Sequence, residues 1–308
     1  MKQDFYYLSA DKETKIHASS WVPSEGQPRA VLQIVHGMVE YIGRYQEFAE
    51  YLAARGFYVT GNDHLGHGES VTSDEKHGYF HKTHGNQYVI EDIHTLRTRT
   101  AEQFPGVPYF MLGHSMGSFL LRQYIGLHGE GLQGVIIMGT GNQPAAVLRA
   151  GKAICRVLSL FKGDTYRSAF VNNMAFGSYN KQFEPARTTH DWLTKDTAIV
   201  DKYLADPWCT FVFTLNAYYH MFSGIQIAQS KEHIGAIPKD LPMLIVSGDK
   251  DPVGRFGADI KAAYQIYKEA GLRDLQMKLY PEDRHEILNE LDRNQVYEDL
   301  EKWLTDRI

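Results

Sequence analysis

The stretch PYFMLGHSMGSFLL, residues 108–121, decides the fold. Its opening PYFML is an apolar run of the kind that forms a fully buried parallel strand, and the residues from Ser118 onward suit a helix. Between them, GHSMG at 113–117 matches the pattern G-x-S-x-G. A strand that turns sharply into a helix strains and exposes the middle residue and requires small neighbours. A serine that merely caps a helix would not require both glycines, so the stretch predicts a turn that presents the Ser115 hydroxyl.

The same apolar pattern recurs along the chain and alternates with amphipathic stretches. Short runs that suit buried strands occur at 30–36 (AVLQIVH), 56–60 (GFYVT), 134–138 (GVIIM) and 242–246 (PMLIV). Helical spacing of apolar residues marks 44–55 and 88–104, which lie between such runs. The alternation of strand and helix implies right-handed crossovers, and it predicts an α/β fold with an open, doubly wound, mostly parallel sheet.

The two ends of the chain extend this sheet. Residues 275–280 (LQMKLY) alternate like a strand, and 290–308 carry apolar residues at helical spacing. We expect the latter to pack as a last helix on the sheet. The first twenty residues are expected to form an edge hairpin.

The alternation stops between about residues 141 and 238, where no buried strand is evident and aromatic residues accumulate. We interpret this segment as a helical insertion over the C-terminal edge of the sheet. The expected organisation is a core of residues 1–140 and 239–308, with a helical cap, or lid, at 141–238.

Composition restricts the class of protein. With 308 residues, of which 43% are hydrophobic and 22% charged, the chain is expected to bury a sizeable core. A formal net charge of -5 argues against nucleic acid as the main partner. Charges interrupt the N-terminal aromatic cluster before a signal sequence could form, and no apolar run approaches a membrane span. We therefore expect a cytoplasmic protein whose membrane contact, if any, is peripheral.

The Ser115 hydroxyl requires a base before it can act as a nucleophile at neutral pH. In a fold of this type the partners follow the serine in the order acid, then histidine. Beyond the predicted strand 242–246 the only histidine is His285, in the loop YPEDRHEILNE that precedes the last helix. A lone histidine is more often structural, but its position and order predict His285 as the base.

Two carboxylates compete for the role of the acid. Asp249 and Asp251 both follow the strand 242–246 at its carboxyl end, where ligand chemistry collects in open α/β sheets. Asp251 precedes Pro252, which holds it in a loop, whereas Asp249 is nearer the strand and suits a residue that organises the turn. This difference favours Asp251.

An oxyanion formed by attack of Ser115 needs N–H donors. The helix that follows Ser115 directs its N-terminal amides toward the same point, so Met116 is expected to supply one backbone N–H. The second should come from the loop after an earlier strand, where His36-Gly37-Met38 follows AVLQIV and places Met38 as the donor.

Two histidine pairs invite interpretation as metal ligands. They are His64-x-x-His67 and His81-x-x-His84, but neither has the helical H-E-x-x-H arrangement, and glycines surround the first. A tight structural loop explains the first pair better. We expect no metal and no cofactor.

With these residues assigned, the chain resembles the monoacylglycerol lipase and lysophospholipase branch of the α/β-hydrolases. The resemblance spans nearly the whole chain and depends on five segments in family order, which are HGMVEYIGRY at 36–45, DHLGHGES at 63–70, GHSMGS at 113–118, GDKDPVG at 248–254 and RHEILNE at 284–290. It implies the α/β-hydrolase fold with a helical cap after GVIIM. It also implies Ser115, Asp251 and His285 as nucleophile, acid and base, with Met38 and Met116 as oxyanion donors.

The function expected is that of a serine esterase that cleaves a small-molecule ester with an acyl chain, of monoacylglycerol or lysophospholipid type, through an acyl-enzyme on Ser115. An amidase or aminopeptidase would use the same triad and is the alternative, and a binding protein that lost activity is a third class. Residues 144–161 combine apolar and basic side chains in a pattern that suits an interfacial helix or an acyl tunnel wall. It equally suits a helix that covers the sheet and keeps a solvated basic face.

Overall fold

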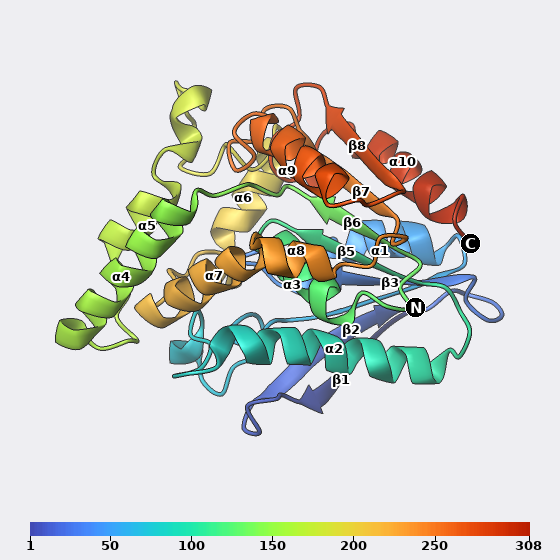
Figure 1. The fold of residues 1–308 in the computed structure, drawn as a ribbon, viewed down its shortest axis with the longest axis horizontal. Helices are drawn as coiled ribbons and strands as arrows, with labels where there is room; N and C mark the ends of the chain where they lie inside the picture. The colour runs from blue at the N-terminus through green and yellow to red at the C-terminus, as the bar shows by residue number, and fades with distance from the viewer.

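The computed structural model describes all 308 residues, and its centre is one eight-stranded sheet (Figure 1). The spatial order of the strands is β1-β2-β4-β3-β5-β6-β7-β8. Their bounds are β1 Lys2–Leu8, β2 Lys15–Trp21, β3 Ala30–Val35, β4 Phe57–Asn62, β5 Tyr109–His114, β6 Gly134–Met138, β7 Met243–Gly248 and β8 Leu275–Tyr280. The strands from β4 to β8 pair in parallel, so the predicted doubly wound sheet is confirmed.

The N-terminal hairpin expected from the sequence is also present. β1 pairs with β2 in antiparallel register, from Lys2 opposite Trp21 to Leu8 opposite Lys15, and β2 continues antiparallel onto β4. The hairpin therefore forms one edge of the sheet. None of the helices combines the length and apolar character that crossing a bilayer requires.

Helices cover both faces of the sheet, which explains why its central strands are apolar on both sides. In β5, Tyr109 and Met111 face one apolar cluster, whereas Phe110 and Leu112 face the other. The first cluster lies under α2, α3 and α9, and the second lies under α1 and α10. These helices span α1 Gln46–Ala53, α2 Gly85–Gln103, α3 Met116–His128, α9 Ala258–Glu269 and α10 Arg293–Thr305.

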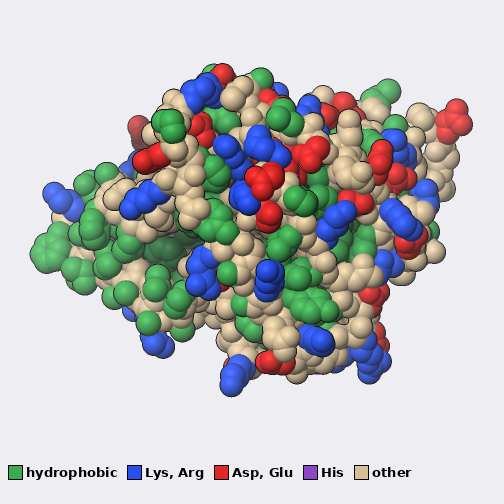
Figure 2. Space-filling view, turned by 90° about the horizontal axis from the view of Figure 1, so that it is seen from above, with side chains coloured by type: hydrophobic (Ala, Val, Ile, Leu, Met, Phe, Trp, Pro, Cys, Tyr) green, Lys and Arg blue, Asp and Glu red, His purple; other side chains and the backbone are tan.

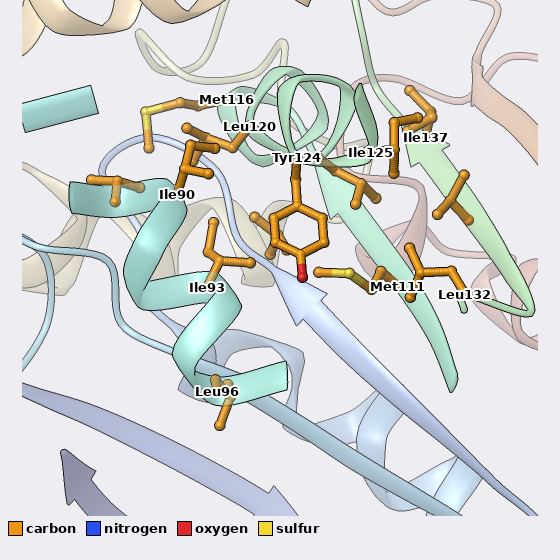
Figure 3. Close-up of a cluster of buried hydrophobic side chains, with 14 of the residues drawn as sticks. Ile90, Ile93, Leu96, Met111, Met116, Leu120, Tyr124, Ile125, Leu132 and Ile137 are labelled. Carbon is orange, nitrogen blue, oxygen red and sulfur yellow. The ribbon is translucent and has the colours of Figure 1, made fainter. Parts of the chain in front are cut away.

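The larger cluster fixes the helix that begins beside Ser115. Figure 3 shows Leu120 and Tyr124 of α3 on the side of Ile90 and Ile93 of α2, whereas Ile125 lies on the other side of Tyr124, above Met111 of β5. All of these side chains are buried. Their packing holds the start of α3 at a fixed place over the end of β5.

Between β6 and β7 the chain contains helices and no strand. They span α4 Ala145–Lys162, α5 Ala169–Phe176, η3 Tyr179–Phe183, α6 Thr197–Ala205, η4 Pro207–Cys209, α7 Leu215–Ala228 and α8 Lys231–Ala236. In Figure 1, α4 and α5 project away from the sheet at the left, whereas α7 and α8 run back toward α3. The remaining short turns are η1 Ile42–Tyr45, η2 Asp74–Lys76 and η5 Ile287–Asn289.

Candidate active site

The five residues predicted for the site come together at one edge of the sheet. Met38 follows β3, Ser115 and Met116 follow β5, Asp251 follows β7, and His285 follows β8. Because these strands are parallel, their carboxyl ends lie along the same edge. The chain thus brings segments nearly 250 residues apart to a single place, as expected for an open α/β sheet.

Ser115 occupies the sharp turn predicted between β5 and α3. Its backbone angles are φ 54° and ψ -121°, a conformation that L-residues rarely adopt. A Cβ on Gly117 would lie 2.0 Å from the carbonyl oxygen of Val35, and one on Gly113 would lie 2.4 Å from the carbonyl oxygen of Gly117. Both glycines are therefore required by close backbone packing, and the backbone N–H of Ser115 is anchored on the carbonyl of Met138 at 3.0 Å.

His285 and Asp251 form a buried pair. The Nδ1–H of His285 donates to Oδ2 of Asp251 at 3.0 Å, and their exposed fractions are 2% and 0%. Burial by itself raises the pKa of Asp251, but the charge of His285 and hydrogen bonds from His285, Ser247 and the N–H of Val253 outweigh it and hold the pKa below its ordinary value. The carboxylate thus stays ionised and fixes the tautomer that leaves Nε2 of His285 available.

Asp249 has a different place. Its Oδ1 accepts the N–H of Glu282 at 2.9 Å, and its side chain is one-third exposed beside Lys250. This carboxylate organises the contact between the loops after β7 and β8. Of the two candidates, Asp251 alone bonds to His285.

The two expected oxyanion donors flank Ser115. The N–H of Met116 is at the first position of α3, where no intrahelical acceptor exists. The N–H of Met38 donates to no atom of the protein. The next residue, Val39, has φ 54°, so the loop after β3 turns sharply at this point. Both amides are free to bind a substrate oxygen.

A charged network beneath the site was not foreseen from the sequence. Arg44 bonds Glu286 through two parallel hydrogen bonds of 2.7 Å and bonds Glu40 at 2.8 Å. Glu40 also accepts the N–H of Gly37 and lies 3.3 Å from Nδ1 of His114. Burial would raise the pKa of Glu40, but His114 and Arg44 outweigh it and hold the pKa far below its ordinary value.

The network joins the loop after β3 to the loop that carries His285. Its members lie in HGMVEYIGRY, GHSMGS and RHEILNE, three segments already singled out by resemblance. Their charges were visible in the sequence, but the pairing of residues 242 positions apart was not.

Ser115 and His285 open onto a cavity of about 650 Å³. Much of its wall comes from the insertion and is polar, including Asn172, Asn173 and Thr188. A second cavity of about 140 Å³ is almost wholly apolar and is lined by Met116, Phe119, Leu148 and Ile225 among others. The two cavities share Met38 and Phe176 in their walls, so they adjoin beside the nucleophile turn.

The first histidine pair contributes to a loop. His64 and His67 are buried, with ring nitrogens near the backbone carbonyls of His36 and Leu65. Burial lowers the pKa of His64 to about 4 and that of His67 to about 3, so both are neutral at pH 7. His64 ties the 63–70 loop to His36 at the end of β3, whereas His67 bonds within the loop itself.

A family model described as serine aminopeptidase, S33, matches residues 26–292, which is most of the chain. The chain belongs to this family. The match includes all five predicted site residues, together with the whole insertion between β6 and β7.

Relatives and solved structures agree with this placement. The chain is 25% identical to the human monoglyceride lipase, over 99% of this chain and 91% of that protein. It is 26% identical to the monoacylglycerol lipase of Mycolicibacterium smegmatis, over 94% and 92%. A thermostable carboxyl esterase from Bacillus coagulans matches with a TM-score of 0.91 and 30% identity, over 99% of this chain and 98% of that one. The expected α/β-hydrolase fold and the resemblance to monoacylglycerol lipases are confirmed.

Proposed function

We propose that this hydrolase cleaves monoacyl esters of an uncharged polyol, of the monoacylglycerol type, through an acyl-enzyme on Ser115. That the chain is a carboxylic ester hydrolase follows from its relatives. The observation that carries the finer proposal is that Ser115 and His285, whose Nδ1 bonds the buried Asp251, line one cavity. This cavity adjoins the second, apolar cavity of about 140 Å³, which we call the apolar annex.

In the first step, Nε2 of His285 takes the proton of the Ser115 hydroxyl while Oγ attacks the ester carbonyl carbon. The tetrahedral oxyanion binds the N–H groups of Met38 and Met116. The bond to the alcohol oxygen then breaks, and the proton on His285 passes to the departing alcohol. A water molecule then repeats these steps. His285 takes a proton from the water while the water oxygen attacks the acyl carbon, and the oxygen of Ser115 leaves and takes that proton from His285 as the fatty acid is released.

The two cavities suggest where the two parts of the substrate lie. The apolar annex beside Met116 suits the acyl chain, and the larger polar cavity suits the alcohol. An enclosed apolar cavity of about 150 Å³ holds a benzene-sized ligand, so an annex of about 140 Å³ takes roughly six carbons before the chain must reach its rim.

The charges of the large cavity favour an uncharged head group. Its charged side chains, apart from histidines, are Glu40, Arg44 and Glu286. Arg44 is bonded to both carboxylates, so no cation remains unpaired to hold a phosphate. For this reason we favour a monoacylglycerol over a lysophospholipid among the substrates expected from the sequence.

The alternative of an aminopeptidase, which the description of the family suggests, meets a similar obstacle. The ammonium group of a peptide would need an unpaired carboxylate in the cavity. Glu40 and Glu286, the carboxylates that line it, already accept from Arg44. The cavity therefore favours the ester over the peptide.

We also propose that residues 141–238 act as a cap that contacts lipid surfaces through α4 and α5. Apolar side chains are exposed on these helices, including Leu160 at 83%, Phe161 at 80% and Phe170 at 65%. Figure 2 shows apolar side chains gathered at this end of the molecule with basic ones among them. Arg149, Lys152 and Arg156 on α4 match the headgroups of an anionic lipid or micelle surface.

The test uses the purified protein and a fluorophosphonate probe. Wild-type protein should be labelled, and Ser115→Ala should not. Turnover is then compared for a monoacylglycerol, a lysophosphatidylcholine of the same chain and an aminoacyl anilide. Faster turnover of the anilide would overturn the ester proposal, and faster turnover of the lysophospholipid would overturn the uncharged head group.

A further inference from the structure

The segment Asp191–Lys195, DWLTK, of the insertion lies against the loop that carries His285. The backbone N–H of Glu286 donates to the carbonyl of Leu193 at 2.7 Å, and that of His285 donates to the carbonyl of Trp192 at 3.4 Å. Arg284 bonds the carbonyl of Asp191 through its guanidinium. The backbone amides of His285 and Glu286 thus find their acceptors in the insertion and not in the sheet.

Side chains extend the contact over the rest of the loop. The hydroxyl of Thr194 donates to the carbonyl of Asn289 at 3.0 Å, and Nζ of Lys195 lies 2.6 Å from Oδ1 of Asp283. The N–H of Lys195 donates to Glu290 at 3.0 Å. Asp283 and Glu290 are both fully buried, and the ammonium group of Lys195 is the cation that pairs with these two carboxylates.

The imidazole itself is also held from this side. The ring of Trp192 lies 5.1 Å from that of His285, and the ring of His114 lies 4.7 Å from it. The ring of Trp192 packs in turn against that of Tyr179, with 5.1 Å between the ring centres. The backbone N–H of Trp192 donates to Oδ1 of Asn180 at 3.0 Å. One wall of the histidine therefore belongs to the core and the other to the insertion.

We infer that Asp191–Lys195 is a clasp through which the insertion positions His285, so that the base is in place only while the insertion is docked. Trp192 and Lys195 are its positioning residues, and they act through His285. The inference rests on the proposed role of His285. Its physical basis is that a base must lie within hydrogen-bond reach of the serine, whereas a loop whose buried amides lose their acceptors does not keep one geometry.

The first experiment removes the cation. In Lys195→Met we expect fluorophosphonate labelling of Ser115 and kcat on a soluble short-chain ester to fall about tenfold or more, because a small misplacement of a catalytic group has that effect. KM should stay within about twofold, since Lys195 does not line the cavity. Lys195→Arg should restore activity, and Lys202→Met, on the exposed face of α6, is the matched control.

Hydrogen–deuterium exchange gives a readout that does not depend on turnover. In Lys195→Met the amides of residues 285 and 286 should exchange faster, while β8 stays protected.

A second set of variants tests Trp192. Trp192→Ala should lower kcat as well, and Trp192→Phe should retain most of it. Trp208→Ala is the control, since Trp208 contacts Tyr41 instead of His285. If Lys195→Met does not fold, Thr194→Val carries the same comparison.

The outcomes separate the two proposals. Unchanged labelling and unchanged exchange in Lys195→Met and Trp192→Ala would show that the clasp does not position His285. A wild-type protein that resists the probe would instead refute the role of Ser115, and the exchange comparison would still decide on the clasp.

Discussion

Arg44 and Glu286 form a two-fold hydrogen-bonded ion pair, with Nη1 2.7 Å from Oε1 and Nη2 2.7 Å from Oε2. The pair joins the loop after β3 to the residue that follows His285. Both side chains are nearly buried, and Arg44 also bonds the buried carboxylate of Glu40. A single cation thus pairs with two carboxylates, and His114 lies 3.3 Å from the one on Glu40.

Arg44→Met should destabilise the fold by about 3–5 kcal/mol, because it leaves buried carboxylates without their partner. Urea denaturation at pH 7 measures the change. The control is Arg293→Met, which removes a more exposed ion pair with Glu47 and should cost at most about 1 kcal/mol. Equal costs for the two variants would contradict the role assigned to Arg44.

Asp251→Asn should lower kcat on a chromogenic ester by about 10³ to 10⁴, since the amide can present the wrong hydrogen-bonding group to His285. Asp249→Asn should stay within about threefold of wild type, because Asp249 bonds the N–H of Glu282 and not the base. Steady-state kinetics on both variants makes the comparison. A greater loss in Asp249→Asn would return the acid role to that residue.

Leu148→Trp should fill the apolar annex and shift preference toward shorter acyl chains. Leu148 is buried in its wall and packs with Phe119 and Ile225. Turnover of eight-carbon esters should fall about tenfold relative to that of two-carbon esters, since overpacking costs about 1–3 kcal/mol. The matched control is Leu127→Trp on the exposed side of α3. A uniform loss across all chain lengths would place the acyl chain elsewhere.

Replacing both Leu160 and Phe161 by serine should weaken binding to anionic phospholipid vesicles by about tenfold or more, given the apolar area lost. Turnover of a soluble short-chain ester should be unchanged, because neither residue lines a site cavity. Vesicle sedimentation and ester kinetics measure the two effects. Leu291→Ser, which alters another exposed leucine that lies away from α4, is the control, and the same loss there would remove the case for α4.

Asp92 provides a prediction about pH. Burial raises the pKa of this carboxyl to about 7, although it accepts hydrogen bonds from Ser9 and the N–H of Ala10. A carboxyl whose pKa is raised by folding binds its proton more tightly in the native state, so its ionisation lowers stability as pH rises from about 4 to 7. Relative to that of Asp92→Asn, the free energy of unfolding of the wild type should fall by on the order of a few kcal/mol over that interval.

Denaturation of both proteins at several pH values from 4 to 8 tests the sign. A difference in unfolding free energy that does not vary with pH would mean that Asp92 titrates normally. Asp11→Asn, which alters a carboxyl whose pKa is lowered below its ordinary value of 3.8, is the control, and its difference from wild type should stay nearly flat from pH 5 to 8 because Asp11 is ionised throughout.

The sequence by itself determined the sheet, and it was enough to predict the nucleophile and the base. Buried parallel strands must be apolar on both faces, so the runs at 30–36, 108–112 and 242–246 could be predicted to be strands from the sequence alone. The glycines around Ser115 predicted the sharp turn, since only the absence of a Cβ permits the close contacts that Gly113 and Gly117 make. Chain order then left His285 as the one eligible histidine.

Only the tertiary structure decided which groups meet. The hydrogen bond from His285 separates Asp251 from Asp249, and the pairing of Arg44 with Glu286 and the contact of Trp192 with His285 join segments far apart in the chain. Such contacts depend on the directions in which loops leave the sheet, and local periodicity carries no information about them. The charges and aromatic rings were present in the sequence, but their partners were set by the fold.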